Sequence, residues 1–139
     1  MATLKKLAIR GIRSFDDKDE SVIEFSPVTV IVGHNGSGKT TIIECLKYAT
    51  TGDKPANTQK GGAFVHDPRV ANEKKVKAQV KLMFNTGSGK PMLVVRNSSV
   101  KLEESGALTF ETLESILKNA SNNEENGKVR RVVRDSVWG

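Results

Sequence analysis

A glycine-rich segment at residues 33–40 constrains the fold of this chain more than any other feature. It has the form G-x-x-x-x-G-K-T, the pattern of a phosphate-binding loop placed between a strand and a helix. Residues 28–32 (VTVIV) are almost all apolar and β-branched, as expected of a strand buried on both faces. Residues 39–49 then take up helical spacing. Together these segments predict the strand–loop–helix unit of an α/β protein.

The chemistry of this loop predicts a site for a nucleoside triphosphate and Mg²⁺. Its glycines allow successive backbone N–H groups to turn toward a polyphosphate, and the following helix N-terminus adds partial positive charge. Lys39 is expected to reach the β- and γ-phosphates as the catalytic residue, and the Thr40 hydroxyl to ligate Mg²⁺. A chance match to the pattern arises in roughly one chain in a few hundred of this length, and the flanking segments make it rarer.

The acidic residue that phosphoryl transfer needs on a second strand is not evident in the sequence. The nearest apolar runs end at Asp67 and Asp135, but His66 and Arg134 interrupt them. The guanine-reading Asn-Lys-x-Asp motif and the Asp-x-x-Gly switch of GTPases are also absent from the sequence. We therefore expect one half of a nucleotide-hydrolysing site rather than a complete one.

Composition limits which cellular compartments and which kinds of binding partner are expected for this chain. The chain has 139 residues, with 22 Lys and Arg against 16 Asp and Glu; the net charge of +6 is compatible with a polyanionic partner. An aromatic content of 5% argues against a protein that stacks single-stranded bases. Cys45 is the single cysteine, so an internal disulfide or a cysteine-based zinc site is excluded. No apolar run approaches the ~20 residues of a membrane span, and we expect an intracellular chain without membrane contact.

The remaining segments read mainly as antiparallel β structure. Residues 4–15 and 22–25 predict a strand pair around an acidic loop, and residues 76–84 alternate apolar and polar side chains. The turn at 86–89 joins that strand to the run 92–95 in a hairpin. Further expectations are short strands at 100–102 and 108–110, a short helix containing Leu113, Ile116 and Leu117, and a polar, mobile segment at 121–127.

The helix after the loop is predicted to bury an apolar stripe and to end at a glycine. The expected stripe consists of Ile42, Ile43, Leu46 and Ala49. Cys45 is interpreted as a small core residue of the same helix. Gly52 is the expected end, because Pro55 just beyond it cannot continue a helix.

Several separated blocks resemble the N-terminal half of an SMC/ABC-type ATPase head, and most closely the RAD-fifty-type ATPases of DNA double-strand-break repair. The blocks are residues 11–15, 40–48, 64–68, 77–82 and 110–114, within a matched stretch of residues 4–118. The resemblance implies an α/β fold in which residues 1–139 form the N-terminal lobe of a P-loop ATPase head. That lobe has a mixed sheet, the phosphate-loop helix and an antiparallel β-subdomain at residues 76–110.

The resemblance also implies the residues of the nucleotide site. The family's phosphate site matches Asn35, Gly36, Gly38, Lys39, Thr40 and Thr41, with Ser37 inside the same loop. Arg13 matches a basic residue near the nucleotide, and Val65 and Asp67 match the segment lying against the adenosine. Without the resemblance, Arg13 reads as a surface arginine on a strand. The lone His66 is interpreted as structural rather than as a metal ligand.

The implied function is ATP and Mg²⁺ binding in a repair complex that binds and tethers DNA and regulates a nuclease. In this family two heads build one active site, and hydrolysis needs a signature motif and a Walker B strand beyond the matched stretch. The chain alone is therefore expected to be an inactive part of an ABC/SMC-type ATPase. The implied partners are the C-terminal lobe of the same head, a second head, the nuclease subunit of the MRN/MRX complex and double-stranded DNA. The implied location is the nucleus, on chromosomes.

Two alternatives from other functional classes remain open. A self-sufficient small P-loop kinase or NTPase predicts turnover by this chain alone. A non-enzymatic DNA-binding module with a vestigial loop predicts a DNA affinity that ATP does not change. Lysines crowd one region and fit either a solvated polar face or a track for DNA phosphates. They are Lys74, Lys75, Lys77 and Lys81.

Overall fold

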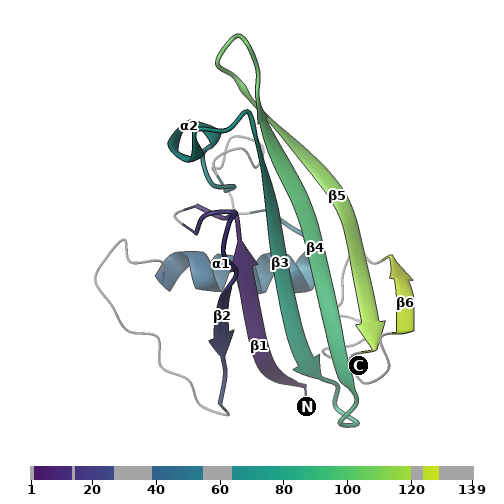
Figure 1. Cartoon of the computed structure of the whole chain (residues 1–139). Coiled ribbons are helices and arrows are strands. Elements are labelled where there is room, and N and C mark those ends of the chain that lie inside the picture. The colour runs from purple at the N-terminus through teal and green to yellow at the C-terminus, as the bar shows by residue number, and fades with distance from the viewer. Residues whose placement is uncertain (1, 14, 27–38, 55–63, 120–123, 129–139) are drawn as a thin grey trace.

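A computed structural model describes residues 2–13, 15–26, 39–54, 64–119 and 124–128, which form an antiparallel sheet with a helix against one face (Figure 1). The strands are β1 (Thr3–Arg10), β2 (Ser21–Glu24), β3 (Lys75–Asn85), β4 (Pro91–Leu102), β5 (Leu108–Asn119) and β6 (Glu124–Lys128). They lie in the order β2-β1-β3-β4-β5-β6, and neighbours in this order pair antiparallel. The helices are α1 (Lys39–Thr51) and the short α2 (Pro68–Ala71). The strand predicted at 28–32 and most of the predicted loop lie outside the described residues.

Alternation of apolar and polar residues builds the sheet and its core. β3 confirms the prediction for residues 76–84, because every second side chain along it is buried. In the register, Leu7 lies opposite Leu82 and Leu82 lies opposite Val94, and all three side chains are fully buried. Each such burial contributes about 1.5–3 kcal/mol, so a row of them across three strands strongly favours this register. The strand pair predicted near the N-terminus is confirmed by β1 and β2.

A bulge in β5 explains why part of that strand resembled a helix in sequence. The step from Arg96 to Ser98 on β4 lies opposite the longer step from Thr112 to Ser115, so β5 carries an extra residue there. The extra residue reverses the alternation, and residues 110 and 117 pack against the same core although an odd number of positions separates them. Odd spacing of apolar residues is also what a helix produces. The short helix predicted at Leu113, Ile116 and Leu117 is therefore wrong.

The strand boundaries correct two further expectations. Residues 100–102, expected as a separate short strand, are the end of β4, which follows the predicted hairpin turn. Residues 124–127, expected to be mobile, belong to β6, which pairs with β5. Backbone hydrogen bonds to a neighbouring strand leave no signature in the sequence, so the polar residues 124–127 gave no sign of their pairing with β5.

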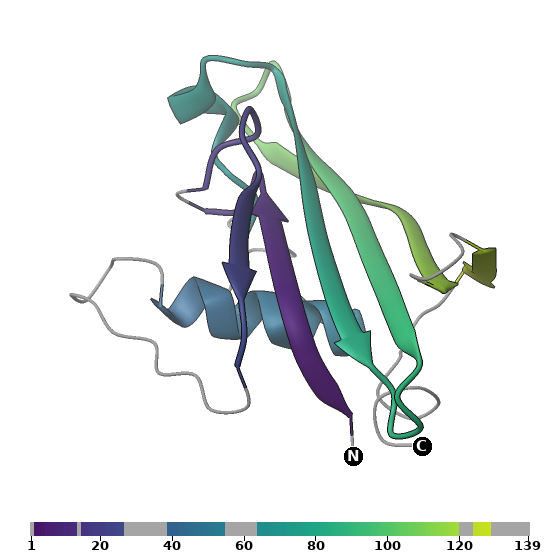
Figure 2. The ribbon, with the colours of Figure 1, turned by 60° about the horizontal axis from the view of Figure 1, so that its bottom comes forward.

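Helix α1 crosses the core face of the sheet, as Figure 2 shows from a second direction. Its buried residues are Thr41, Cys45, Tyr48 and Ala49. The prediction that Cys45 is a core residue is confirmed, and Ile42 and Leu46 are partly buried against the same core. The place predicted for Ile43 in the buried stripe is wrong, because its side chain is 57% exposed. Spacing identifies a helix, but the position of the sheet decides which side of it is covered.

A glycine and an arginine hold the C-terminal end of α1. Gly52 has a φ of 78°, and its N–H donates to the Tyr48 carbonyl at 2.8 Å, which confirms the predicted helix end. The buried Arg96 of β4 donates from Nε to the Ala49 carbonyl at 3.1 Å. A cation is favourable at this end of a helix. Neither α1 nor α2 has the length and apolarity of a membrane span, among the residues described.

Candidate nucleotide site

Helix α1 brings the end of the glycine-rich motif to the core face of the sheet. The helix begins at Lys39; Thr40 is exposed in its first turn, and Thr41 is buried. An exposed hydroxyl in the first turn is able to reach a cation held at the loop, and a helix N-terminus attracts anions. The four loop residues predicted to bind phosphate lie outside the described part, as does the side chain of Lys39. They are Asn35, Gly36, Ser37 and Gly38.

The connection after β1 is a tight turn that requires glycine at its first residue. Gly11 has a φ of 69°, and a Cβ placed there would lie 2.2 Å from the Lys77 carbonyl oxygen of β3. Its N–H donates to the Asp16 carbonyl, and its own carbonyl accepts from the His66 N–H, each at 2.8 Å. The turn is thereby held against β3 and against residues 64–67.

Arg13, the basic residue predicted near the nucleotide, connects three segments. Its N–H donates to the Phe64 carbonyl at 2.9 Å, and its carbonyl accepts a hydrogen bond from His66 Nδ1. Its guanidinium donates from Nε and Nη2 to the two carboxylate oxygens of Glu44 on α1, each at 3.0 Å. Such a bidentate ion pair is directional as well as strong. It ties the turn after β1 to the helix that follows the phosphate-loop motif.

Residues 64–67 carry Val65 and Asp67, which the resemblance assigned to the adenosine side. Val65 is buried and forms an isolated bridge with Ile12, so its side chain belongs to the core and only its backbone is available to a ligand. Asp67 caps α2 by accepting the Arg69 N–H at 2.9 Å, and it pairs with the Arg69 guanidinium at 3.0 Å. The hydrogen bonds from Arg69 lower the pKa of Asp67. Contact of either residue with a nucleotide stays a prediction.

His66 lies between these two residues and is buried, with its ring hydrogen-bonded to the Arg13 carbonyl. This geometry fits the structural role predicted for it. Among the residues described, no group of three or more His, Cys, Asp or Glu side chains is placed to hold a metal ion. Coordination of Mg²⁺ by the Thr40 hydroxyl, which is exposed in the first turn of α1, stays a prediction.

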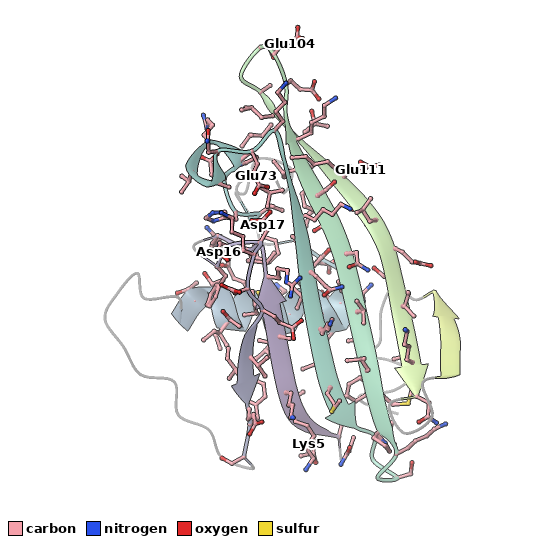
Figure 3. The ribbon with its side chains drawn as sticks, in the orientation of Figure 1. Lys5, Asp16, Asp17, Glu73, Glu104 and Glu111 are labelled. Carbon is pink, nitrogen blue, oxygen red and sulfur yellow. The ribbon has the colours of Figure 1, made fainter. Side chains whose placement is uncertain are left out.

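Three acidic residues lie near the same turn. Figure 3 shows Asp16, Asp17 and Glu73 between the end of β1 and α2. The backbone N–H groups of Asp19 and Lys18 donate to Asp16 and lower its pKa. A hydrogen bond with Asp17 raises the pKa of Glu73. These contacts connect the turn to neighbouring backbone and side-chain groups.

The lysines of β3 lie on the sheet face opposite α1. Lys77 and Lys81 alternate with the buried residues of that strand, and Lys81 pairs with Glu20 at 3.2 Å. A surface cavity of about 390 Å³ opens beside Lys77 and is lined in part by Arg10 and Glu114. This face mixes both signs of charge, so it fits a solvated surface and a DNA track equally well.

The structure brings together predicted residues that are far apart in the sequence and adds two that were missed. Arg13, Val65 and Asp67 lie in segments that contact one another, and Arg13 links them to α1. Glu44 and Gly11 were missed. Glu44 follows Thr40 by one helical turn, but nothing in the sequence names Arg13 as its partner.

Comparison with known proteins finds relatives of this chain. A family model described as "AAA domain" (AAA_23) matches residues 6–135. The DNA repair protein RAD50 of Saccharomyces cerevisiae is 54% identical over 123 residues, which are 88% of this chain and 9% of that protein. RAD50 of Arabidopsis thaliana is 45% identical over 119 residues, 85% of this chain and 9% of the relative. The chain thus spans 9% of the length of these relatives.

A solved structure shares the fold. It comes from work titled "Structural biochemistry of ATP-driven dimerization and DNA stimulated activation of SMC ATPases", and it covers 90% of this chain and 72% of its own. The TM-score is 0.56 and the sequence identity is 22%. The expected fold of an SMC-type ATPase head is confirmed, and so is the resemblance to RAD-fifty-type ATPases.

Proposed function

Because this chain belongs to the AAA-domain family, we propose that it binds Mg-ATP as the N-terminal half of a DNA repair ATPase head. The observation that carries the proposal is helix α1, which begins at Lys39, within the phosphate-loop motif, and packs on the sheet core. The proposed division of residues 1–139 puts the phosphate loop at 33–40 and a β-rich subdomain at 76–110.

The predicted site residues other than Thr41, which is buried in α1, have the following proposed roles. The loop from Asn35 to Gly38 surrounds the phosphates with its backbone N–H groups, Lys39 neutralises the β- and γ-phosphates, and the Thr40 hydroxyl ligates Mg²⁺. Thr40 suits this role because it is exposed in the first turn of α1. Arg13 approaches the nucleotide from the turn after β1. Residues 65–67 approach its adenosine, with Val65 acting through its backbone.

The proposed activity of the whole protein is ATP hydrolysis in DNA double-strand-break repair. The head would be completed by a C-terminal lobe, and the active site by a second head that ATP holds in place. The further proposed partners are a nuclease subunit and double-stranded DNA, and the proposed location is the nucleus. The names of the RAD50 relatives, which are DNA repair proteins, support this proposal.

The experiment measures Mg-ATP binding and phosphate release together on the 139-residue chain. We expect binding without release, and Lys39→Ala should weaken binding at least tenfold, since a charge-assisted contact to phosphate is worth about 1.5–3 kcal/mol. Lys47→Ala is the matched control, because Lys47 lies exposed on the same helix. Thr40→Ala should remove the Mg²⁺ dependence of binding, and circular dichroism checks that each variant folds.

Two results would favour the alternative functions. Phosphate release that depends on Lys39 and proceeds at an enzyme-like rate would identify a complete small P-loop enzyme. A DNA affinity that neither ATP nor Lys39→Ala changes, with no ATP binding, would identify a DNA-binding module with a vestigial loop.

A further inference from the structure

We propose that Glu44 is a positioning residue of the nucleotide site, which holds the Arg13 guanidinium beside the first turns of α1, where it meets the polyphosphate. This inference rests on the proposed function, because it assigns a partner to a residue of that same site. Glu44 lies in the block 40–48 that carries the family resemblance, but neither the loop motif nor the resemblance assigned it a role.

The position of Glu44 on α1 is one helical turn beyond Thr40, the last residue of the phosphate-loop motif. Glu44 follows Thr40 by four residues, so it lies about 6 Å further along the helix axis and on the same side. Its carboxylate, 18% exposed, accepts from both Nε and Nη2 of Arg13 at 3.0 Å. A two-point contact of this kind fixes the plane of the guanidinium as well as its distance.

The backbone of Arg13 is fixed independently of its side chain. A φ of 47° places Arg13 in the left-handed region, and hydrogen bonds to Phe64 and from His66 hold it on both sides. A conformation that is rarely adopted, yet held by neighbouring segments, is typical of functional sites. Because the Arg13 backbone is already held, Glu44 determines only the direction of the long Arg13 side chain.

Among the residues described, part of the Arg13 guanidinium is open to a ligand. Its side chain is 36% exposed, and the bidentate pair engages Nε and Nη2. Within the described residues, Nη1 donates to no other side chain, so its two N–H groups can donate to phosphate oxygens. The pair also neutralises the Glu44 carboxylate, which alone would repel a polyphosphate at this distance.

The test compares Mg-ATP affinity among variants of the 139-residue chain. Glu44→Gln should weaken binding about tenfold, because the amide cannot hold the guanidinium through two charged hydrogen bonds. The swapped variant Arg13→Glu with Glu44→Arg should restore the ion pair and the melting temperature but leave ATP binding weak. Its guanidinium then starts from the helix rather than from the turn. Glu24→Gln is the matched control, since Glu24 pairs with Lys6 at 3.5 Å on exposed strands.

Two results would overturn the inference alone. The first is an ATP affinity of Glu44→Gln equal to or tighter than that of the wild type. The second is full recovery of ATP affinity in the swapped variant, which would make the ion pair purely structural. If Glu44→Gln does not fold, Arg13→Lys makes the same comparison, because lysine keeps the charge but lacks the planar fork. Wild-type chain that binds no Mg-ATP in a Lys39-dependent way would overturn the proposed function, and this inference with it.

Discussion

At the scale of single residues, Gly11 sets the turn that carries Arg13. Gly11→Ala would place a Cβ 2.2 Å from the Lys77 carbonyl at a φ of 69°, so β1 and β3 would have to separate. We expect the free energy of unfolding to fall by about 2–4 kcal/mol, measured by urea denaturation. Gly106→Ala is the control, because Gly106 shares a positive φ of 86° but has open space around it. Its loss should be about 1 kcal/mol. Equal losses in the two variants would contradict the close approach of Gly11 to β3.

We expect Glu73 to give the stability of the fold a pH dependence. The hydrogen bond with Asp17 raises the pKa of Glu73 above its ordinary 4.5, because the shared hydrogen bond needs a proton. The folded chain then holds this proton more tightly than the unfolded chain. The Glu73–Asp17 hydrogen bond therefore stabilises the folded chain fully below pH about 4.5. This stabilisation is lost as the pH rises through the raised pKa of Glu73. Glu73→Gln supplies a permanent donor, so its melting temperature should exceed the wild type's at pH 7, with the difference shrinking toward acidic pH.

The control for that comparison is Glu104→Gln, in the turn between β4 and β5, far from Glu73 (Figure 3). Thermal melts of the wild type, Glu73→Gln and Glu104→Gln at several pH values test whether the Asp17 contact causes the difference in melting temperature. An increase at pH 7 that Glu104→Gln shares, or one that persists unchanged in acid, would rule out the Asp17 contact as its cause.

At the scale of elements, docking of α1 on the sheet determines how the nucleotide site is supported. Cys45 lies in that interface, and its burial raises the pKa of the thiol to about 12. A soluble thiol reagent at pH 8 should therefore react at least about a hundredfold more slowly with the folded chain than with the chain in urea. Reaction at the unfolded rate under native conditions would mean that α1 leaves the sheet freely.

At the scale of the whole molecule, one end of the sheet gathers the candidate site. The turn after β1 and the segment leading to α2 lie at the same end in Figures 1 and 2, and the Arg13–Glu44 pair connects them to α1. Helix α1 covers one face of the sheet, so the lysines of β3 are on the other. A nucleotide bound at the helix and a polyanion bound at the lysine face would thus lie on opposite sides of one sheet. This arrangement is consistent with the proposed pairing of ATP binding and DNA binding in one head.

Several elements were predictable from the sequence because their signals are local. The alternation along β3, the helix after the loop motif and its end at Gly52 follow from the spacing and conformational preferences of neighbouring residues. The helix predicted near Leu113 failed because a bulge shifts the alternation of β5, and a bulge is defined by pairing with β4. Strand β6 was missed because it depends on backbone hydrogen bonds to β5.

By itself, the sequence determined the family, most of the strands and the long helix, and it predicted the chemistry of the phosphate-loop motif. These signals lie in the types and spacing of residues that are close together in the chain. Only the tertiary structure decided that Arg13 meets Glu44, that Gly11 lies against Lys77, and that Ile43 faces away from the core. These contacts join segments far apart in the chain. Their partners are set by how the sheet and α1 pack, and no local pattern records that packing.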